Sequence, residues 1–145
     1  TQVEVNDWYR HMHAVKDAMI KMNIPLALYH DVSICIDAEA LACGEVRFSR
    51  LYIPADTAYA ARYSNFVMLP EGFYLTTSEH MVADANGDSL EYRAICRLAS
   101  YAREHGYDIC GDMLDEGDVL VPFNPHEATN KVARIQLPVN IDHAW

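Results

Sequence analysis

The spacing of hydrophobic residues in the first third of the chain predicts one helix followed by two strands. Between residues 7 and 22, apolar side chains recur every three or four positions, which is the period of a helix with one buried face. This stripe consists of Trp8, Met12, Val15, Met19 and Met22. Residues 32–39 and 45–53 instead alternate between apolar and polar side chains, which is typical of half-buried strands.

The middle of the chain predicts a further strand region and a second helix. Residues 66–79 hold two apolar pieces, which a Pro-Glu-Gly turn or bulge at 70–72 separates. Residues 89–105 carry a helical apolar face that begins at a capping residue, either Asp88 or Ser89. Within this helix, Glu91 is placed for a capping box, and a glycine follows the last turn.

The last part of the chain predicts two more strands, over residues 118–123 and 132–141. The complete order is therefore α-β-β-β-α-β-β, which is typical of an α+β fold. Since the chain has 145 residues, we expect it to form one domain over residues 1–145.

An internal repeat is visible at an offset of 84 residues. The segment RLYIPA at 50–55 and the segment RIQLPV at 134–139 share an arginine, two aliphatic positions and a proline. At the same offset, the apolar faces of the two predicted helices coincide. We therefore predict two copies of a β-α-β-β unit, at about residues 6–56 and 66–141, related by pseudo-twofold symmetry. The sheet is expected to be antiparallel, with both helices on one face.

The repeat implies a strand that has no counterpart in this sequence. The second copy begins with the strand region at 66–79, and its equivalent in the first copy would lie upstream of Thr1. The chain also begins without an initiator Met. We therefore expect the first strand of copy one to be absent, either because the chain is a fragment or because the unit is shortened. The sheet edge at that position would be incomplete or covered by another segment.

Composition and charge exclude several classes of protein. The net charge is −10, and the longest apolar stretches fall far short of the roughly 18 residues that span a bilayer. The 11 basic residues are scattered, whereas nucleic-acid binding needs clustered Lys and Arg. No secretory signal is present. We therefore expect a cytoplasmic domain that binds neither nucleic acid nor membrane directly and that suits cationic or neutral ligands.

The cysteines and histidines predict no metal site and no cofactor. The cysteine spacing contains no C-x-x-C pair, so we expect four free, buried thiols: Cys35, Cys43, Cys96 and Cys110. His11 and His13 lie two residues apart on a predicted helix, where their side chains point in different directions.

Four short segments, taken in their order and spacing, carry a family resemblance. They are PLALYHD at 25–31, LPEGFY at 69–74, GYDICGD at 106–112 and ARIQLPV at 133–139. Together they resemble the gyrase-inhibitor-like (GyrI-like) effector-binding domain, which ends many MerR-type multidrug-responsive transcription regulators and also occurs alone. The resemblance covers about residues 6–141, and the duplicated β-α-β-β architecture of that family agrees with the repeat.

The resemblance implies a ligand-sensing domain of a transcription regulator. Its pocket would lie between the two repeats and hold aromatic or lipophilic, often cationic, compounds. A buried acid favours a cation with which it pairs, and aromatic rings add cation–π attraction. DNA would be contacted only through an upstream domain, and a homodimer is left open. By position, the resemblance assigns Tyr29 as an aromatic wall residue and either Asp115 or Glu116 as the pocket carboxylate. It assigns Met81 and Tyr92 as apolar wall residues. Trp8 and Met12 on the first helix are two further candidates.

The sequence also leaves alternatives open. Asp115 and Glu116, followed by a glycine, fit a surface turn as well as a pocket. No nucleophile, zinc, P-loop or dinucleotide motif is present, so we expect no enzyme. Some stand-alone relatives look like hydrolases that use the same cleft, and in that alternative Glu45, Asp115 or Glu116 would act as the base. His80 is expected to be exposed.

Overall fold

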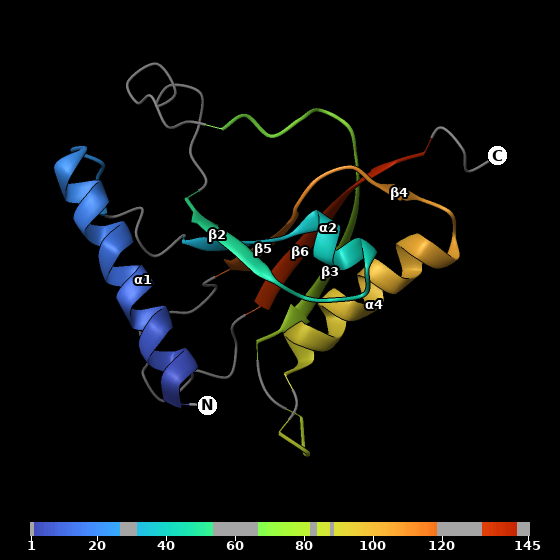
Figure 1. The fold of residues 1–145 in the computed structure, drawn as a ribbon, viewed down its shortest axis with the longest axis horizontal. Coiled ribbons are helices and arrows are strands. Elements are labelled where there is room, and N and C mark those ends of the chain that lie inside the picture. Colours follow the sequence, from blue (N-terminus) through green and yellow to red (C-terminus); the bar gives the residue numbers. More distant parts are fainter. Residues whose placement is uncertain are drawn as a thin grey trace.

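The computed structural model describes residues 2–26, 32–53, 67–81, 84–87, 89–118 and 132–141. Within these residues, three helices accompany an open antiparallel sheet of six strands (Figure 1). In chain order the elements are α1 (Gln2–Lys21), β1 (Ser33–Ile36), α2 (Ala38–Ala42), β2 (Phe48–Tyr52), β3 (Phe73–His80), α4 (Leu90–Glu104), β4 (Asp108–Ile109), β5 (Met113–Asp118) and β6 (Val132–Asn140). The predicted α+β class and the antiparallel sheet are confirmed.

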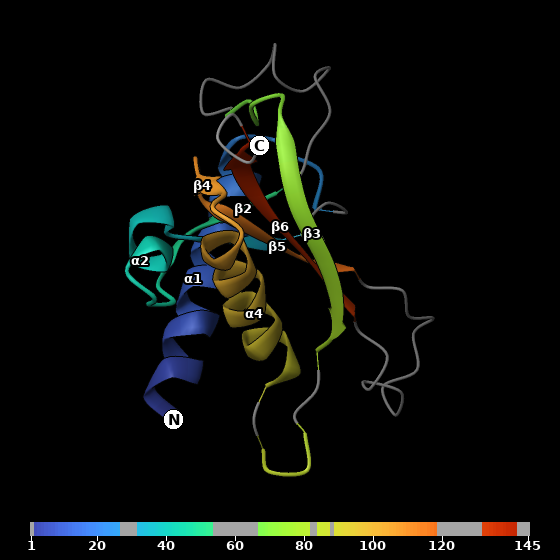
Figure 2. The same ribbon diagram turned by 90° about the vertical axis from the view of Figure 1, so that its right-hand side faces the viewer.

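The sheet joins two antiparallel pairs of strands. Its order is β2-β1-β5-β6-β3, and the short β4 pairs with the end of β6. The pairs β1–β2 and β5–β6 meet through the antiparallel contact between β1 and β5. Figure 2 shows β3 as a long strand along one side of the sheet, next to β6.

Helix α4 covers one face of this sheet. It begins at Ser89, whose side-chain oxygen accepts a hydrogen bond from the Tyr92 N–H at 3.1 Å. Just beyond its end, Gly106 adopts a φ of +69°, a conformation that favours glycine. The helix predicted at 89–105 is therefore confirmed, with Ser89 rather than Asp88 as the cap. Glu91 consequently occupies the second helical position, one residue short of the position that a capping box requires.

The strand register separates two faces of the sheet. In β6, every second residue is buried on the face towards α4, namely Ala133, Ile135, Leu137 and Val139, and Pro138 on the opposite face is also buried. The four side chains on the α4 face pack in one core cluster with Ile95, Leu98 and other buried residues of α4. Because directly paired residues of neighbouring strands share a face, the register assigns every residue of β5 and β1 to the α4 face or to the opposite face.

The prediction of a strand over residues 32–39 is wrong at its end. The strand β1 stops at Ile36, and the five residues of α2 follow. Asp37 caps this helix by accepting a hydrogen bond from the Ala40 N–H at 2.8 Å. The Ala38 N–H donates a hydrogen bond of 3.1 Å to Asp112 Oδ1, a carboxylate oxygen 74 residues away in the chain. This distant contact outweighs the local alternating pattern.

Two other strand predictions also need correction. The strand β5 at Met113–Asp118 and the short β4 were not predicted, and the strand predicted at 118–123 lies outside the described residues beyond Asp118. Of the two apolar pieces at 66–79, only the second forms a strand, β3. Val67, Met68 and Leu69 are exposed and form no regular structure, because no neighbouring strand pairs with them in the described residues. The predicted connectors at 56–65 and 124–131 lie outside the described residues.

The apolar stripe of α1 is confirmed where its side chains are described. Met19 is buried, and Met12, Val15 and Met22 are half-buried. The helix begins at Gln2, five residues before the predicted start. It contributes no residue to the core cluster between α4 and the sheet, and Figure 1 shows it beyond β2, apart from α4. No helix among the described residues is both long and apolar enough to cross a membrane.

Candidate functional site

Asp115 places a buried carboxyl group in the middle of the sheet. It lies in β5, opposite Ile34 of β1 on one side and Ile135 of β6 on the other. This register puts its side chain on the face that α4 covers, where only 4% of the residue is exposed. Its Oδ1 atom has no hydrogen-bond partner among the described residues. An unsatisfied buried polar atom costs about 1–3 kcal/mol, so the fold retains an acceptor that it does not itself satisfy.

Glu91, in the first turn of α4, faces this carboxyl group. Its side chain is half-buried and lies within hydrogen-bonding reach of Asp115. Burial, followed by the hydrogen bond and charge of Glu91 and the charge of Glu116, raises the pKa of Asp115 to about 8. Asp115 is therefore mostly protonated at neutral pH. We refer to Asp115 and Glu91 as the carboxyl pair.

The two arginines of α4 that lie nearest to Glu91 in the chain form ion pairs with other acids. Arg93 forms an ion pair with Asp84, and Arg97 Nη2 lies 3.6 Å from Glu79 Oε2. Among the described residues, no ion pair joins a cation to Asp115 or Glu91. The carboxyl pair is thus a region of negative potential whose charge the described side chains do not neutralise.

Met81 forms an apolar wall beside the carboxyl pair. It follows β3, packs against the core cluster and is half-buried. Its sulfur lies against Gly117, where a Cβ atom would come within 3.5 Å of it. Gly117 is two residues beyond Asp115 in β5 and therefore lies on the same face of the sheet. Two of the predicted pocket residues, Asp115 and Met81, are thus brought to one region.

Comparisons with known protein families, with curated proteins and with solved structures find no match. The family resemblance therefore remains an expectation from the sequence, and function must be argued from the geometry of the site.

Glu116 belongs to a different environment from Asp115. It lies on the opposite face of β5, where its Oε2 accepts a hydrogen bond from Gln136 Nε2 at 2.9 Å. Tyr52 lies close to it, and burial, reinforced by the negative charge of Glu116, raises the pKa of the tyrosine. Both acids lie within a strand, so the turn interpretation of this segment is wrong. Asp115 and Glu116 were alternatives for the pocket carboxylate, and they lie on opposite faces of the sheet.

The other predicted pocket residues are not gathered around Asp115. Tyr92 is 51% exposed in the first turn of α4, and the charge of Cys96 raises the pKa of its hydroxyl. No described contact brings Met12 of α1 to the carboxyl pair. The side chain of Trp8 and the whole of Tyr29 lie outside the described residues. The roles of these four residues stay predictions.

Sequence reasoning assigned Glu91 only to a helix cap and missed its place in the site. A signal for it was present in the spacing of α4. Glu91 precedes Ile95 by four positions and Leu98 by seven, so it lies on the apolar face of the helix. A lone acid on an apolar helical face is costly to bury without a partner, and it marks a position that faces another polar group.

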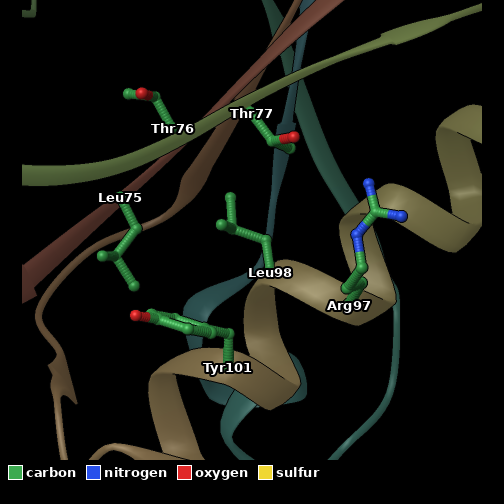
Figure 3. Close-up of a pocket in the computed structure, with 6 residues that line it drawn as sticks. All are labelled: Leu75, Thr76, Thr77, Arg97, Leu98 and Tyr101. Carbon is green, nitrogen blue, oxygen red and sulfur yellow. The ribbon is translucent and has the colours of Figure 1, made fainter.

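A second feature on the same face is a hollow of about 390 Å³ between β3 and α4 (Figure 3). None of its residues was predicted to bind a ligand; they are Leu75, Thr76, Thr77, Arg97, Leu98 and Tyr101. Thr77 pairs with Ile135, which pairs with Asp115, so the hollow is two strand spacings, about 10 Å, from the carboxyl pair. Ile135 is fully buried between them, which separates the hollow from Asp115.

The structure gathers no group of three or more metal-ligating side chains among the described residues. His80 is exposed, as predicted, and so are His11 and His13. The prediction of four buried thiols is wrong for two cysteines. Cys35 is buried and Cys96 is half-buried, whereas Cys43 and Cys110 are exposed because they follow α2 and β4 at the surface. Glu45, the other acid considered as a base, is also exposed.

Proposed function

We propose that this protein is the ligand-sensing domain of a transcription regulator, and that it binds a small aromatic or lipophilic cation at Asp115. The observation that carries the proposal is the buried Oδ1 atom of Asp115, which has no described partner. A cation at this atom would pair with the ionised carboxylate and remove the cost of burying it. The family resemblance places a pocket carboxylate at this same segment.

The sheet topology supports the duplicated unit that the resemblance implies. The pairs β1–β2 and β5–β6 are arranged on either side of the central β1–β5 contact, as a pseudo-twofold relation requires. The strand β3 flanks β6 on the outer side of the second pair. The strands β2 and β6 begin 84 residues apart, as in the sequence repeat, and β1 and β5 begin 80 apart.

The surroundings of Asp115 suit a ligand that is both apolar and positively charged. Ile34 and Met81 supply apolar contacts on the α4 face, while Glu91 adds a second negative group. Such a combination selects lipophilic cations, because a neutral molecule gains no ion pair and an inorganic ion gains no apolar contact. Binding between α4 and β5 would then bias the arrangement of segments attached to this domain.

The test is a calorimetric titration of the protein with aromatic cations and matched neutral analogues. We expect the cations to bind and to raise the melting temperature, and the neutral analogues to bind more weakly. The Asp115→Asn variant should lose this binding. The Glu116→Gln variant is the matched control, since its side chain lies on the opposite face of the same strand. Equal binding of neutral analogues, or unchanged binding by Asp115→Asn, would contradict the proposal.

A hydrolase remains the second candidate, because Asp115 carries a proton at neutral pH and a general acid needs one. Turnover distinguishes the two functions. A hydrolase would convert a neutral ester catalytically and lose this activity in Asp115→Asn, whereas a sensor would bind its ligand and leave it unchanged.

A further inference from the structure

The contact between Asp115 and Glu91 constrains which cations the site accepts. Ionised carboxylates only accept hydrogen bonds, so two carboxyl groups within hydrogen-bonding reach must share a proton to form one. In the ligand-free protein, this proton supplies both the bond and the charge balance of the pair. A cation that enters the site has to replace both contributions.

We propose that the carboxyl pair binds cations that carry N–H groups, namely primary or secondary ammonium and amidinium compounds, because such groups can donate to the buried, unpaired Oδ1 atom of Asp115. This inference rests on the proposed function and deepens it by naming the ligand class and Glu91 as a specificity-determining residue. An ammonium group donates to both carboxylates and neutralises one of them. A quaternary cation supplies charge but no donor, and it would leave the buried oxygen of Asp115 unpaired.

The described residues that flank Asp115 on the α4 face are apolar apart from Glu91. The exchange of a proton for a cation would therefore involve only these two carboxyl groups among them. From β1 and β6, the residues that flank Asp115 are the apolar Ile34 and Ile135. After β3, Met81 adds a thioether wall. On α4 the charged group that faces Asp115 is Glu91, and on its own strand Glu116 acts from the opposite face.

Nearby cations of the described residues are committed elsewhere. Arg93 pairs with Asp84, and Arg97 pairs with Glu79 at the end of β3. Neither of these two arginines is therefore positioned to take the place of the incoming ammonium group. The two carboxyl groups also supply fewer oxygen ligands than the roughly six to eight that Ca²⁺ takes, which favours an organic cation over this divalent ion.

The experiment compares benzylammonium with benzyltrimethylammonium, with benzyl alcohol and with Ca²⁺ as controls. Each is titrated calorimetrically at pH 7 in two buffers that differ in ionisation enthalpy, which measures the protons released on binding. We expect benzylammonium to bind roughly tenfold more tightly than its trimethyl analogue, the effect of about one unpaired hydrogen bond. Binding should release about one proton per ligand.

Two variants test the role of each carboxyl. Glu91→Gln should still bind cations but with a reduced preference for N–H cations, because Asp115 then stands without its partner. Proton release should be smaller than in the wild type but not absent, because burial, the largest cause of the raised pKa of Asp115, is unchanged. Asp115→Asn should abolish cation binding altogether. Glu116→Gln, on the opposite face, should leave the preference for N–H cations unchanged. Melting curves confirm that each variant is folded before it is titrated.

The outcomes separate this inference from the proposed function. Equal affinity for both ammonium compounds without proton release would overturn the inference and leave the cation-binding function standing. An unchanged preference in Glu91→Gln would overturn the role of Glu91. Tighter binding of Ca²⁺ than of benzylammonium would overturn the ligand class. Failure of every cation to bind to the folded protein would overturn the inference and the proposed function together.

Discussion

Asp115 and Glu116 are consecutive residues of β5, and their carboxyl groups lie on opposite faces of the sheet. Asp115 faces Glu91 of α4 and is almost fully buried. Glu116 instead accepts a hydrogen bond from Gln136. This relation makes Asp115→Asn and Glu116→Gln a matched pair of variants, because each removes one carboxyl from one face.

Protein stability is expected to fall as the pH rises from about 4 to about 8. The pKa of Asp115 is raised to about 8 in the folded chain, so the folded state binds more protons than the unfolded state in this window. One such proton gives a slope of about 1.4 kcal/mol per pH unit. Urea unfolding at several pH values, compared between wild type and Asp115→Asn, isolates this slope. Equal slopes in the two proteins would show that Asp115 is not protonated in the fold.

Loss of the Asp112 side chain is expected to destabilise the protein by about 1–3 kcal/mol. Against the effect of burial, hydrogen bonds from Arg50, the Ala38 N–H and Ser49 hold the pKa of Asp112 below its usual value. Asp112→Ala breaks these links between α2, β2 and the segment before β5. Urea unfolding measures the loss. Asp108→Ala, at an exposed position, is the control, and equal effects of the two variants would contradict this account.

Removal of the α4 cap is expected to cost about 1 kcal/mol. In Ser89→Ala, the Tyr92 N–H loses the oxygen that accepts its hydrogen bond at 3.1 Å. Thermal unfolding should show a lower melting temperature, while Ser78→Ala at an exposed position of β3 should not. A melting temperature unaffected by Ser89→Ala would mean that another group caps the helix.

Truncation of Ile135 is expected to cost about 2–5 kcal/mol as Ile135→Ala and about 0.5–1.5 kcal/mol as Ile135→Val. The side chain is fully buried in the core cluster between α4 and the sheet. Denaturant unfolding should therefore show a graded loss of stability. Thr76→Ala, at an exposed position of β3, should have little effect. A loss of similar size in all three variants would contradict the assignment of the core.

The elements that were predicted well are those whose signals are local. Helix α4 has a clear helical period, a serine cap and a glycine at φ +69° after its end. The strand β6 alternates between buried and more exposed residues from Val132 to Leu137, and the buried Pro138 then interrupts this pattern. The helix α2 was missed because its start depends on Asp112, 74 residues away.

The strand β5 was not predicted at Met113–Asp118 for a similar reason. Its acids and glycine resemble a turn, and only pairing with β1 and β6 on both sides makes this segment a strand. The candidate site was likewise predicted only in part. Asp115 and Met81 followed from the resemblance, whereas the opposition of Glu91 to Asp115 depends on how α4 packs over the sheet.

The most direct measurement is a carbon-13 NMR titration of the Asp115 side-chain carboxyl, with and without saturating benzylammonium. We expect Asp115 to be mostly protonated at pH 7 in the free protein and ionised in the complex. A carboxyl group that is already ionised at pH 6 without ligand, or that keeps its proton when the ammonium compound is bound, would contradict the proposal that Asp115 exchanges a proton for a cation.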